Sequence, residues 1–146
     1  MLKDSQDLLE IRTLGQFTVR YGTAVISDRA RRSTMLWELF KYLLTYRGAR
    51  LSAANVLDVL WTEKEYEDVK SAFKAQVHRL KKLLAESALG DDHIAIVYTQ
   101  GCYRLDIGSR CWLDTIVLED LFNKANQLSS DNPGEAVETY ERVISL

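Results

Sequence analysis

Residues 69–84, VKSAFKAQVHRLKKLL, constrain the fold of this chain more than any other stretch. The stretch holds five lysine or arginine residues and one histidine, but no acidic residue. At 3.6 residues per turn, one side of a helix would carry its apolar residues, which are Val69, Phe73, Val77, Leu80 and Leu84. The opposite side would carry positive charge. We therefore expect a helix over about residues 68–86 with one apolar face and one cationic face.

A cationic face without acids favours nucleic-acid binding over an ordinary solvated face, which usually mixes both signs of charge. The residues that follow support this interpretation. Residues 94–105 read as two short strands joined by a turn at Thr99-Gln100-Gly101-Cys102, in which Gly101 supplies a positive φ. A basic helix followed by a β-hairpin is the layout of a winged helix-turn-helix.

The chain before the basic helix completes such a fold. Residues 9–13, 17–21 and 24–26 show the alternation of a small antiparallel meander with one buried face. Apolar residues at helical spacing predict a first helix that begins at Ser33 or Thr34 and runs through Tyr46. A second helix follows Ser52, a candidate N-cap, and ends near Trp61. The expected fold class is α+β, with N-terminal antiparallel strands, three helices and a C-terminal hairpin wing.

Charge divides the chain into two parts, which we expect to be two domains. The 146 residues carry a net charge of −2, but residues 1–108 hold 16 lysine or arginine residues against 14 acids. Residues 109–146 hold 3 against 7. Any anion-binding surface is therefore expected in residues 1–108.

Residues 109–146 read as a pair of amphipathic helices. The unit begins at Trp112, and its first helix breaks at residues 129–133. The apolar residues that mark this helix are Leu118, Leu121, Phe122, Ala125 and Leu128. Asn132-Pro133-Gly134-Glu135 then fits an N-cap, a proline at the first helical position and an acid at the third. One such pair cannot bury its own apolar faces. It packs on the first domain, dimerises, or belongs to a longer helical-repeat domain, and we favour the last.

Other functions find less support in the composition. Cys102 and Cys111 are too few for a disulfide scaffold and lack the paired spacing of a zinc site, so we expect two reduced thiols and no metal or cofactor. The two histidines, without a glycine-rich phosphate loop or paired carboxylates, do not suggest an enzyme. No apolar run is long enough to cross a membrane, and no secretion signal is evident. We expect a cytoplasmic protein.

Several segments resemble the SARP-type antibiotic regulatory proteins, which combine an OmpR-type winged helix with a tetratricopeptide-like bacterial transcriptional activation domain. The segments are IRTLGQFTV at residues 11–19, LDVLW at 57–61, VHRLKKLL at 77–84, GCYRL at 101–105 and, for the second domain, AVETY at 136–140. The resemblance implies binding to tandem repeats of double-stranded DNA, with a homodimer as one arrangement, and recruitment of RNA polymerase. Lys81 and Lys82 stand where the family usually has arginines, and lysine lacks the bidentate fork of arginine.

The candidate DNA-binding residues follow from this layout. On the recognition helix they are Lys70, Ser71, Lys74, Ala75, His78, Arg79, Lys81 and Lys82. On the wing they are Thr99, Gln100 and Arg104. Candidate contacts to the DNA backbone are Arg29, Arg31 and Arg32, for which pairing with the acids of residues 63–68 is an equal alternative.

Two questions about partners stay open. The resemblance implies that Glu63, Glu65 and Glu67 belong to a loop that contacts RNA polymerase, although a solvated loop explains these acids equally well. A winged helix can also lose its DNA role and bind an acidic partner through the same face. The excess of acids in residues 63–68 and in residues 109–146 suits that alternative, a protein-interaction module without DNA-binding activity.

Overall fold

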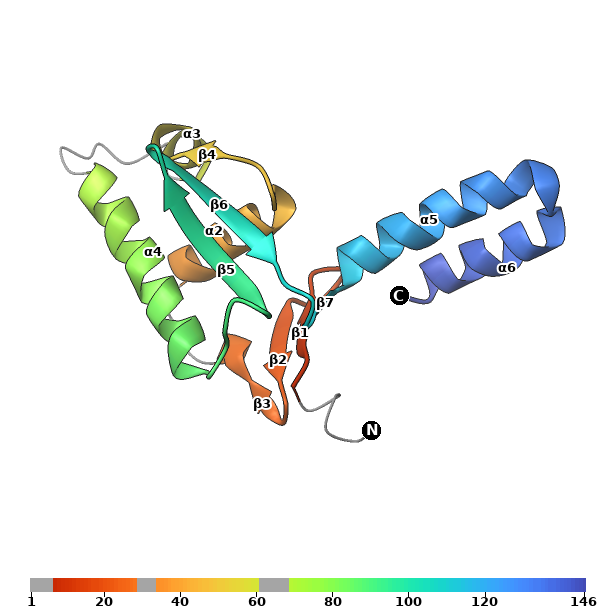
Figure 1. The fold of residues 1–146 in the computed structure, drawn as a ribbon, viewed down its shortest axis with the longest axis horizontal. Coiled ribbons are helices and arrows are strands. Elements are labelled where there is room, and N and C mark those ends of the chain that lie inside the picture. The colour runs from red at the N-terminus through yellow and green to blue at the C-terminus, as the bar shows by residue number, and fades with distance from the viewer. Residues whose placement is uncertain (1–6, 29–33, 61–68) are drawn as a thin grey trace.

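The computed structural model describes residues 7–28, 34–60 and 69–146 of the chain (Figure 1). The side chains of Asp28, Thr34, Val69 and Lys70 also lie outside the described part. Strands and helices are mixed, and they form a body with two small sheets and an arm of two helices that projects from it. None of the helices in these ranges is long and apolar enough to cross a membrane.

The first sheet has the strand order β3-β2-β1-β7. The strands β1 (Leu9–Arg12), β2 (Thr18–Tyr21) and β3 (Ala24–Val25) are the predicted antiparallel meander, and η1 (Ile26–Asp28) follows it. The strand β7 (Cys111–Leu113), which the sequence did not predict, pairs in parallel with β1. Trp112, the expected start of the second unit, lies in this strand, and the helix that follows contains the predicted Leu118 and Leu128.

Three helices follow the meander and build the core. They are α2 (Thr34–Thr45), α3 (Ala53–Leu60) and α4 (Val69–Glu86), each close to its predicted range. Phe40 of α2 and Phe73 of α4 have no exposed surface, and the core also takes in Leu9 and Val19 from the first sheet. The Ser52 hydroxyl accepts a hydrogen bond from the Asn55 N–H at 3.2 Å, as expected of an N-cap.

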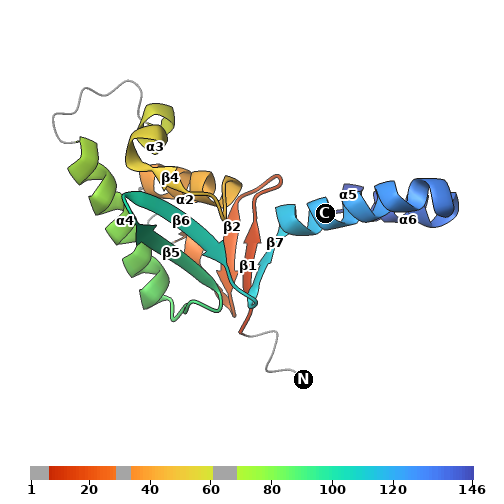
Figure 2. The same cartoon turned by 45° about the horizontal axis from the view of Figure 1, so that its top comes forward.

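The second sheet has the order β4-β6-β5 and contains the predicted hairpin (Figure 2). The strands β5 (Ile94–Thr99) and β6 (Cys102–Ile107) are antiparallel, and β4 (Leu51–Ser52) adds to β6. The turn between them has φ of 53° at Gln100 and 78° at Gly101. Two successive positive φ values are typical of the type I′ turn that joins tightly paired strands, so the expected role of Gly101 is confirmed.

The arm consists of α5 (Asp114–Asp131) and α6 (Pro133–Ile144), which pack against each other side by side (Figure 1). The break between them is shorter than the predicted residues 129–133, because α5 continues through Asp131. The Asn132 side chain accepts a hydrogen bond from the Glu135 N–H at 3.3 Å, and Pro133 begins the helix. The predicted capping arrangement is therefore confirmed.

A buried carboxylate joins the arm to the body. Asp114, the first residue of α5, is only 1% exposed. Its carboxylate accepts hydrogen bonds from the Thr13 N–H at 2.8 Å, the Thr13 hydroxyl at 3.0 Å and the Leu14 N–H at 2.8 Å. The parallel pairing of β1 and β7 brings these residues together, because Thr13 follows β1 and Asp114 follows β7.

Candidate nucleic-acid interface

The helix α4 has two distinct faces. Phe73 and Leu80 are fully buried, and Val77 and Leu84 are nearly so, which fixes the apolar side of α4 against the core. The candidate residues on the opposite side are exposed, and they are Ser71, Lys74, Ala75, His78, Arg79, Lys81 and Lys82. The amphipathic helix is thus as predicted, and contact of this face with DNA stays a prediction.

The exposed face of α4 carries little negative charge of its own. Glu86, the last residue of the helix, is its only acid, and its carboxylate lies 3.9 Å from the Lys82 ammonium. Both side chains are more than half exposed, so water and salt screen this pair and it adds little stability. The positive charges of Lys74, Arg79 and Lys81 therefore face solvent.

Arg104, a predicted wing residue, is held by its own strand. Its guanidinium donates two hydrogen bonds to the Asp106 carboxylate, from Nε at 2.8 Å and from a terminal nitrogen at 2.9 Å. These bonds raise the pKa of Arg104 above its ordinary value. The other two wing residues, Thr99 and Gln100, are exposed at the end of the hairpin. Contact between Arg104 and DNA would thus compete with the bond to Asp106.

A groove runs between α4 and the β5–β6 hairpin. Its volume is about 280 Å³. The helix contributes one wall and the hairpin the other, and the lining residues are Lys74, Val77, His78, Lys81, Tyr98 and Tyr103. The groove therefore joins the two elements that the sequence assigns to DNA, the cationic helix and the wing.

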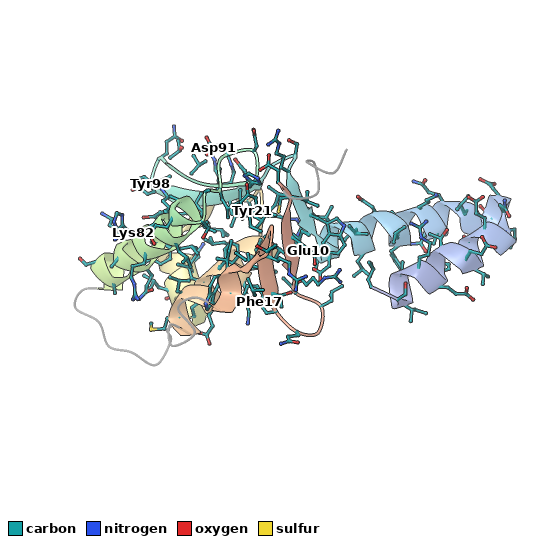
Figure 3. The ribbon with its side chains drawn as sticks, turned by 90° about the horizontal axis from the view of Figure 1, so that it is seen from below. Glu10, Phe17, Tyr21, Lys82, Asp91 and Tyr98 are labelled. Atoms are coloured by element: carbon teal, nitrogen blue, oxygen red, sulfur yellow. The ribbon has the colours of Figure 1, made fainter. Side chains whose placement is uncertain are left out.

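Tyr98 is the residue of this groove that the sequence analysis missed. Its ring lies 4.8 Å from that of Tyr103, and the Tyr103 ring lies 5.0 Å from Phe73 in an edge-to-face arrangement. Phe73 and Tyr103 are buried, whereas Tyr98 is 54% exposed, and burial raises the pKa of Tyr103. The three rings thus lead from the core to the surface. Tyr98, at the outer end of the series, lies near α4 (Figure 3). The alternation of β5 is the signal for Tyr98, because it continues the face of Ile94 and Ile96.

Other candidate residues lie outside the described part of the chain. They are the backbone-contact candidates Arg29, Arg31 and Arg32 and the polymerase-loop candidates Glu63, Glu65 and Glu67. Lys70 lies in the first turn of α4, but its side chain is not described. The predictions for these residues stay predictions.

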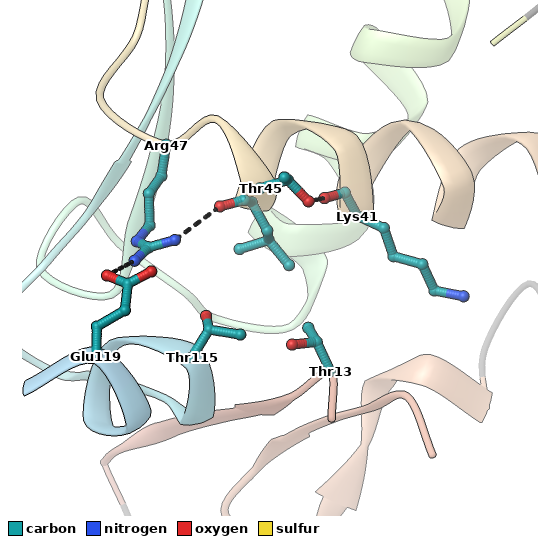
Figure 4. Close-up of a pocket in the computed structure, with 7 residues that line it drawn as sticks. Thr13, Lys41, Thr45, Arg47, Thr115 and Glu119 are labelled. Carbon is teal, nitrogen blue, oxygen red and sulfur yellow. Dashed lines mark hydrogen bonds and ion pairs between the residues drawn. The ribbon is translucent and has the colours of Figure 1, made fainter. Parts of the chain in front are cut away.

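A second hollow, of about 380 Å³, lies where α2, the end of β1 and α5 meet (Figure 4). Arg47 crosses it and donates hydrogen bonds to the Leu44 carbonyl oxygen at 3.3 Å and to Glu119 at 3.0 Å. Lys41 and Thr115 also line it. Although it is larger than the groove beside α4, its Arg47 is already paired, so we regard this hollow as part of the joint between body and arm. In the ranges that the structure covers, no cluster of three or more metal-binding side chains occurs.

These elements form a mixed α/β fold. It is similar to the solved structure of Mycobacterium tuberculosis EmbR in complex with a low-affinity phosphopeptide, with a TM-score of 0.68 and 16% sequence identity. The match covers 94% of this chain and 34% of EmbR, so the chain spans about a third of the length of that protein. At this identity the likeness concerns the fold alone. No protein-family model matches the chain, and no curated protein matches its sequence.

Proposed function

We propose that this chain is the DNA-binding part of a bacterial transcription regulator of the SARP type, with a winged helix-turn-helix that binds double-stranded DNA. One observation carries the proposal: α4 exposes Lys74, His78 and Lys81 beside the β5–β6 hairpin, while its opposite face is fixed in the core. A helix held in this way offers a rigid cationic surface of a width that the major groove admits.

In this arrangement α4 enters the major groove and the hairpin lies over the adjacent backbone or minor groove. Ser71, Lys74, Ala75 and His78, with Lys70, face base edges and phosphates, whereas Arg79, Lys81 and Lys82 hold the backbone. Because lysine is a point charge, most of the affinity is expected to come from phosphates and to depend strongly on salt.

The resemblance to SARP-type regulators extends the proposal to partners. Two copies would bind tandem repeats of DNA, and the loop with Glu63, Glu65 and Glu67 would contact RNA polymerase. Arg29, Arg31 and Arg32 would add contacts to the DNA backbone. The cytoplasm is the compartment where such a regulator works.

The test replaces two of the exposed lysines of α4. We expect Lys74→Ala/Lys81→Ala to weaken binding to a random-sequence duplex and to flatten the dependence of log affinity on log salt by about 1.8, since each lost phosphate contact contributes about 0.9. Fluorescence anisotropy of a labelled duplex at several salt concentrations measures both quantities. The matched control is Lys124→Ala/Arg142→Ala, which removes two exposed positive charges from the arm.

The outcomes separate the two candidate functions. An equal slope for both double variants would contradict the assignment of α4 to DNA. No salt-sensitive association of the unaltered protein with any duplex would instead favour the protein-interaction module. The net charge of −2 and the pairing of Arg104 with Asp106 are the observations on the side of that second candidate.

A further inference from the structure

The groove between α4 and the hairpin is built from hydrogen-bond donors. Lys74, His78 and Lys81 are spaced four and three residues apart, so they form one stripe along the helix. Each of these side chains is exposed. Among the described residues that line the groove, none carries a carboxylate. Two ammonium groups on one wall favour an anion.

Tyr98 gives the hairpin wall a polar group of its own. Its ring rests on Tyr103, which is 6% exposed and packs on the fully buried Phe73. A ring supported in this way loses little freedom when a ligand binds, and its hydroxyl can donate one hydrogen bond. The groove therefore offers charge from the helix and a positioned neutral donor from the hairpin.

The size of the groove fits a small oxyanion. Its volume is about 280 Å³. This is room for a phosphodiester group with a few of its waters. Arg104 is the wing residue that the sequence predicts as a DNA contact. Its guanidinium already donates two hydrogen bonds to the Asp106 carboxylate.

We propose that this groove seats one phosphodiester of the DNA backbone, held by the ammonium groups of Lys74 and Lys81 and by the hydroxyl of Tyr98. The proposal rests on the proposed function, and it adds the residue and the ligand group through which the hairpin is anchored. The seat couples the wing to α4, because one phosphate bridges both elements. His78 lies between the two lysines on the same wall.

A double-mutant cycle between Tyr98→Phe and Lys81→Ala tests the seat. Affinity for a labelled random-sequence duplex is measured by fluorescence anisotropy at several salt concentrations. Tyr98→Phe removes one neutral hydrogen bond, so it is expected to weaken binding about three- to tenfold and to leave the salt slope unchanged. Lys81→Ala is expected to flatten the slope by about 0.9. The double variant should lose less affinity than the product of the two single losses, because both groups hold the same phosphate.

The matched control is Tyr46→Phe, the same change at a tyrosine that directly follows α2 and is 48% exposed. Thermal unfolding of every variant establishes that each one folds. If Tyr98→Phe behaves like Tyr46→Phe, or if the losses at Tyr98 and Lys81 simply multiply, the phosphate seat is overturned while DNA binding stands. If the unaltered protein binds no duplex at any salt concentration, the proposed function is overturned and the seat with it.

Discussion

His93 and Gly108 illustrate how single positions fix the connection between α4 and the hairpin. His93 is 5% exposed, and its Nδ1 accepts a hydrogen bond from the Gly90 N–H at 3.1 Å. Its Nε2 therefore carries the proton and donates to the Asp7 carbonyl oxygen at 2.8 Å. The Gly108 N–H donates to the His93 carbonyl oxygen at 3.0 Å, and a Cβ on Gly108 would lie 2.0 Å from the carbonyl oxygen of Asp92. The backbone around His93 leaves no space for a side chain at position 108.

Gly108→Ala should therefore destabilise the protein. We expect the free energy of unfolding to fall by about 2–3 kcal/mol, in the upper range for single substitutions, since the atom that meets the new methyl group belongs to backbone. Urea unfolding followed by circular dichroism measures the change. Gly90→Ala is the matched control, because nothing lies within 4 Å of a Cβ there. Equal stabilities of the two variants would contradict the close approach.

At the residue scale, the sequence predicts the exposure of some candidate residues but not the contacts of others. Periodicity alone separates the exposed Lys74 and Lys81 from the buried Val77, because the period of a helix is regular. The state of Arg104 depends on whether Asp106, two residues along the same strand face, captures it. Tyr98 reads as one more apolar strand residue until the structure places it against α4. Spacing puts Tyr98 on one strand face and Arg104 two residues from Asp106, but it does not show that Tyr98 lies beside α4 or that the ion pair forms.

Among the elements, the helices and the hairpin are the parts that the sequence predicts well. Their apolar patterns repeat over several turns or alternations. Local signals also mark where elements begin or turn, as Ser52 and Asn132 do for α3 and α6 and Gly101 does for the hairpin. The strands β4 and β7 have only two and three residues. No periodicity can develop over such a length, and their partners β6 and β1 are remote in sequence, so only the folded chain reveals them.

Asn132 is the local signal with the clearest energetic consequence. It accepts the Glu135 N–H, and its amide donates to the Glu135 carboxylate at 3.2 Å. Asn132→Ala should cost about 1 kcal/mol of the stability of α6. Native-state hydrogen exchange of α6 amides measures this loss. Asn123→Ala, an exposed change inside α5, should leave the stability unchanged or slightly higher. Unchanged protection of α6 in Asn132→Ala would contradict the capping role.

The whole molecule consists of a body and an arm with few contacts between them. Beyond its first two turns, α5 packs mainly on α6 (Figure 2). Phe122, Val137 and Ile144 of the arm are 49%, 57% and 85% exposed. The hydrogen bonds of Asp114 and the ion pair between Arg47 and Glu119 fix the arm to the body.

Asp114→Ala should release this connection. Three donors lose a buried charged acceptor, so we expect the free energy of unfolding to fall by about 3 kcal/mol. We also expect NMR relaxation to report faster independent motion of the arm than in the unaltered protein. The control is Asp120→Ala, an exposed change on the same helix. Relaxation of the arm that matches this control would contradict the role of Asp114 as the joint.

Because Asp114 is the first residue of α5, a small rotation there produces a large displacement at the far end of the helix. Its 18 residues make it about 27 Å long, at about 1.5 Å per residue. A rotation of about 10° at Asp114 would therefore carry the far end of the arm through about 5 Å, whereas Thr13 and Leu14 at the pivot would hardly shift. A force applied at the far end of the arm would therefore act with a large torque on the β1–β2 turn. It would also reach the end of α2, because Arg47 bonds both Glu119 of α5 and the Leu44 carbonyl oxygen.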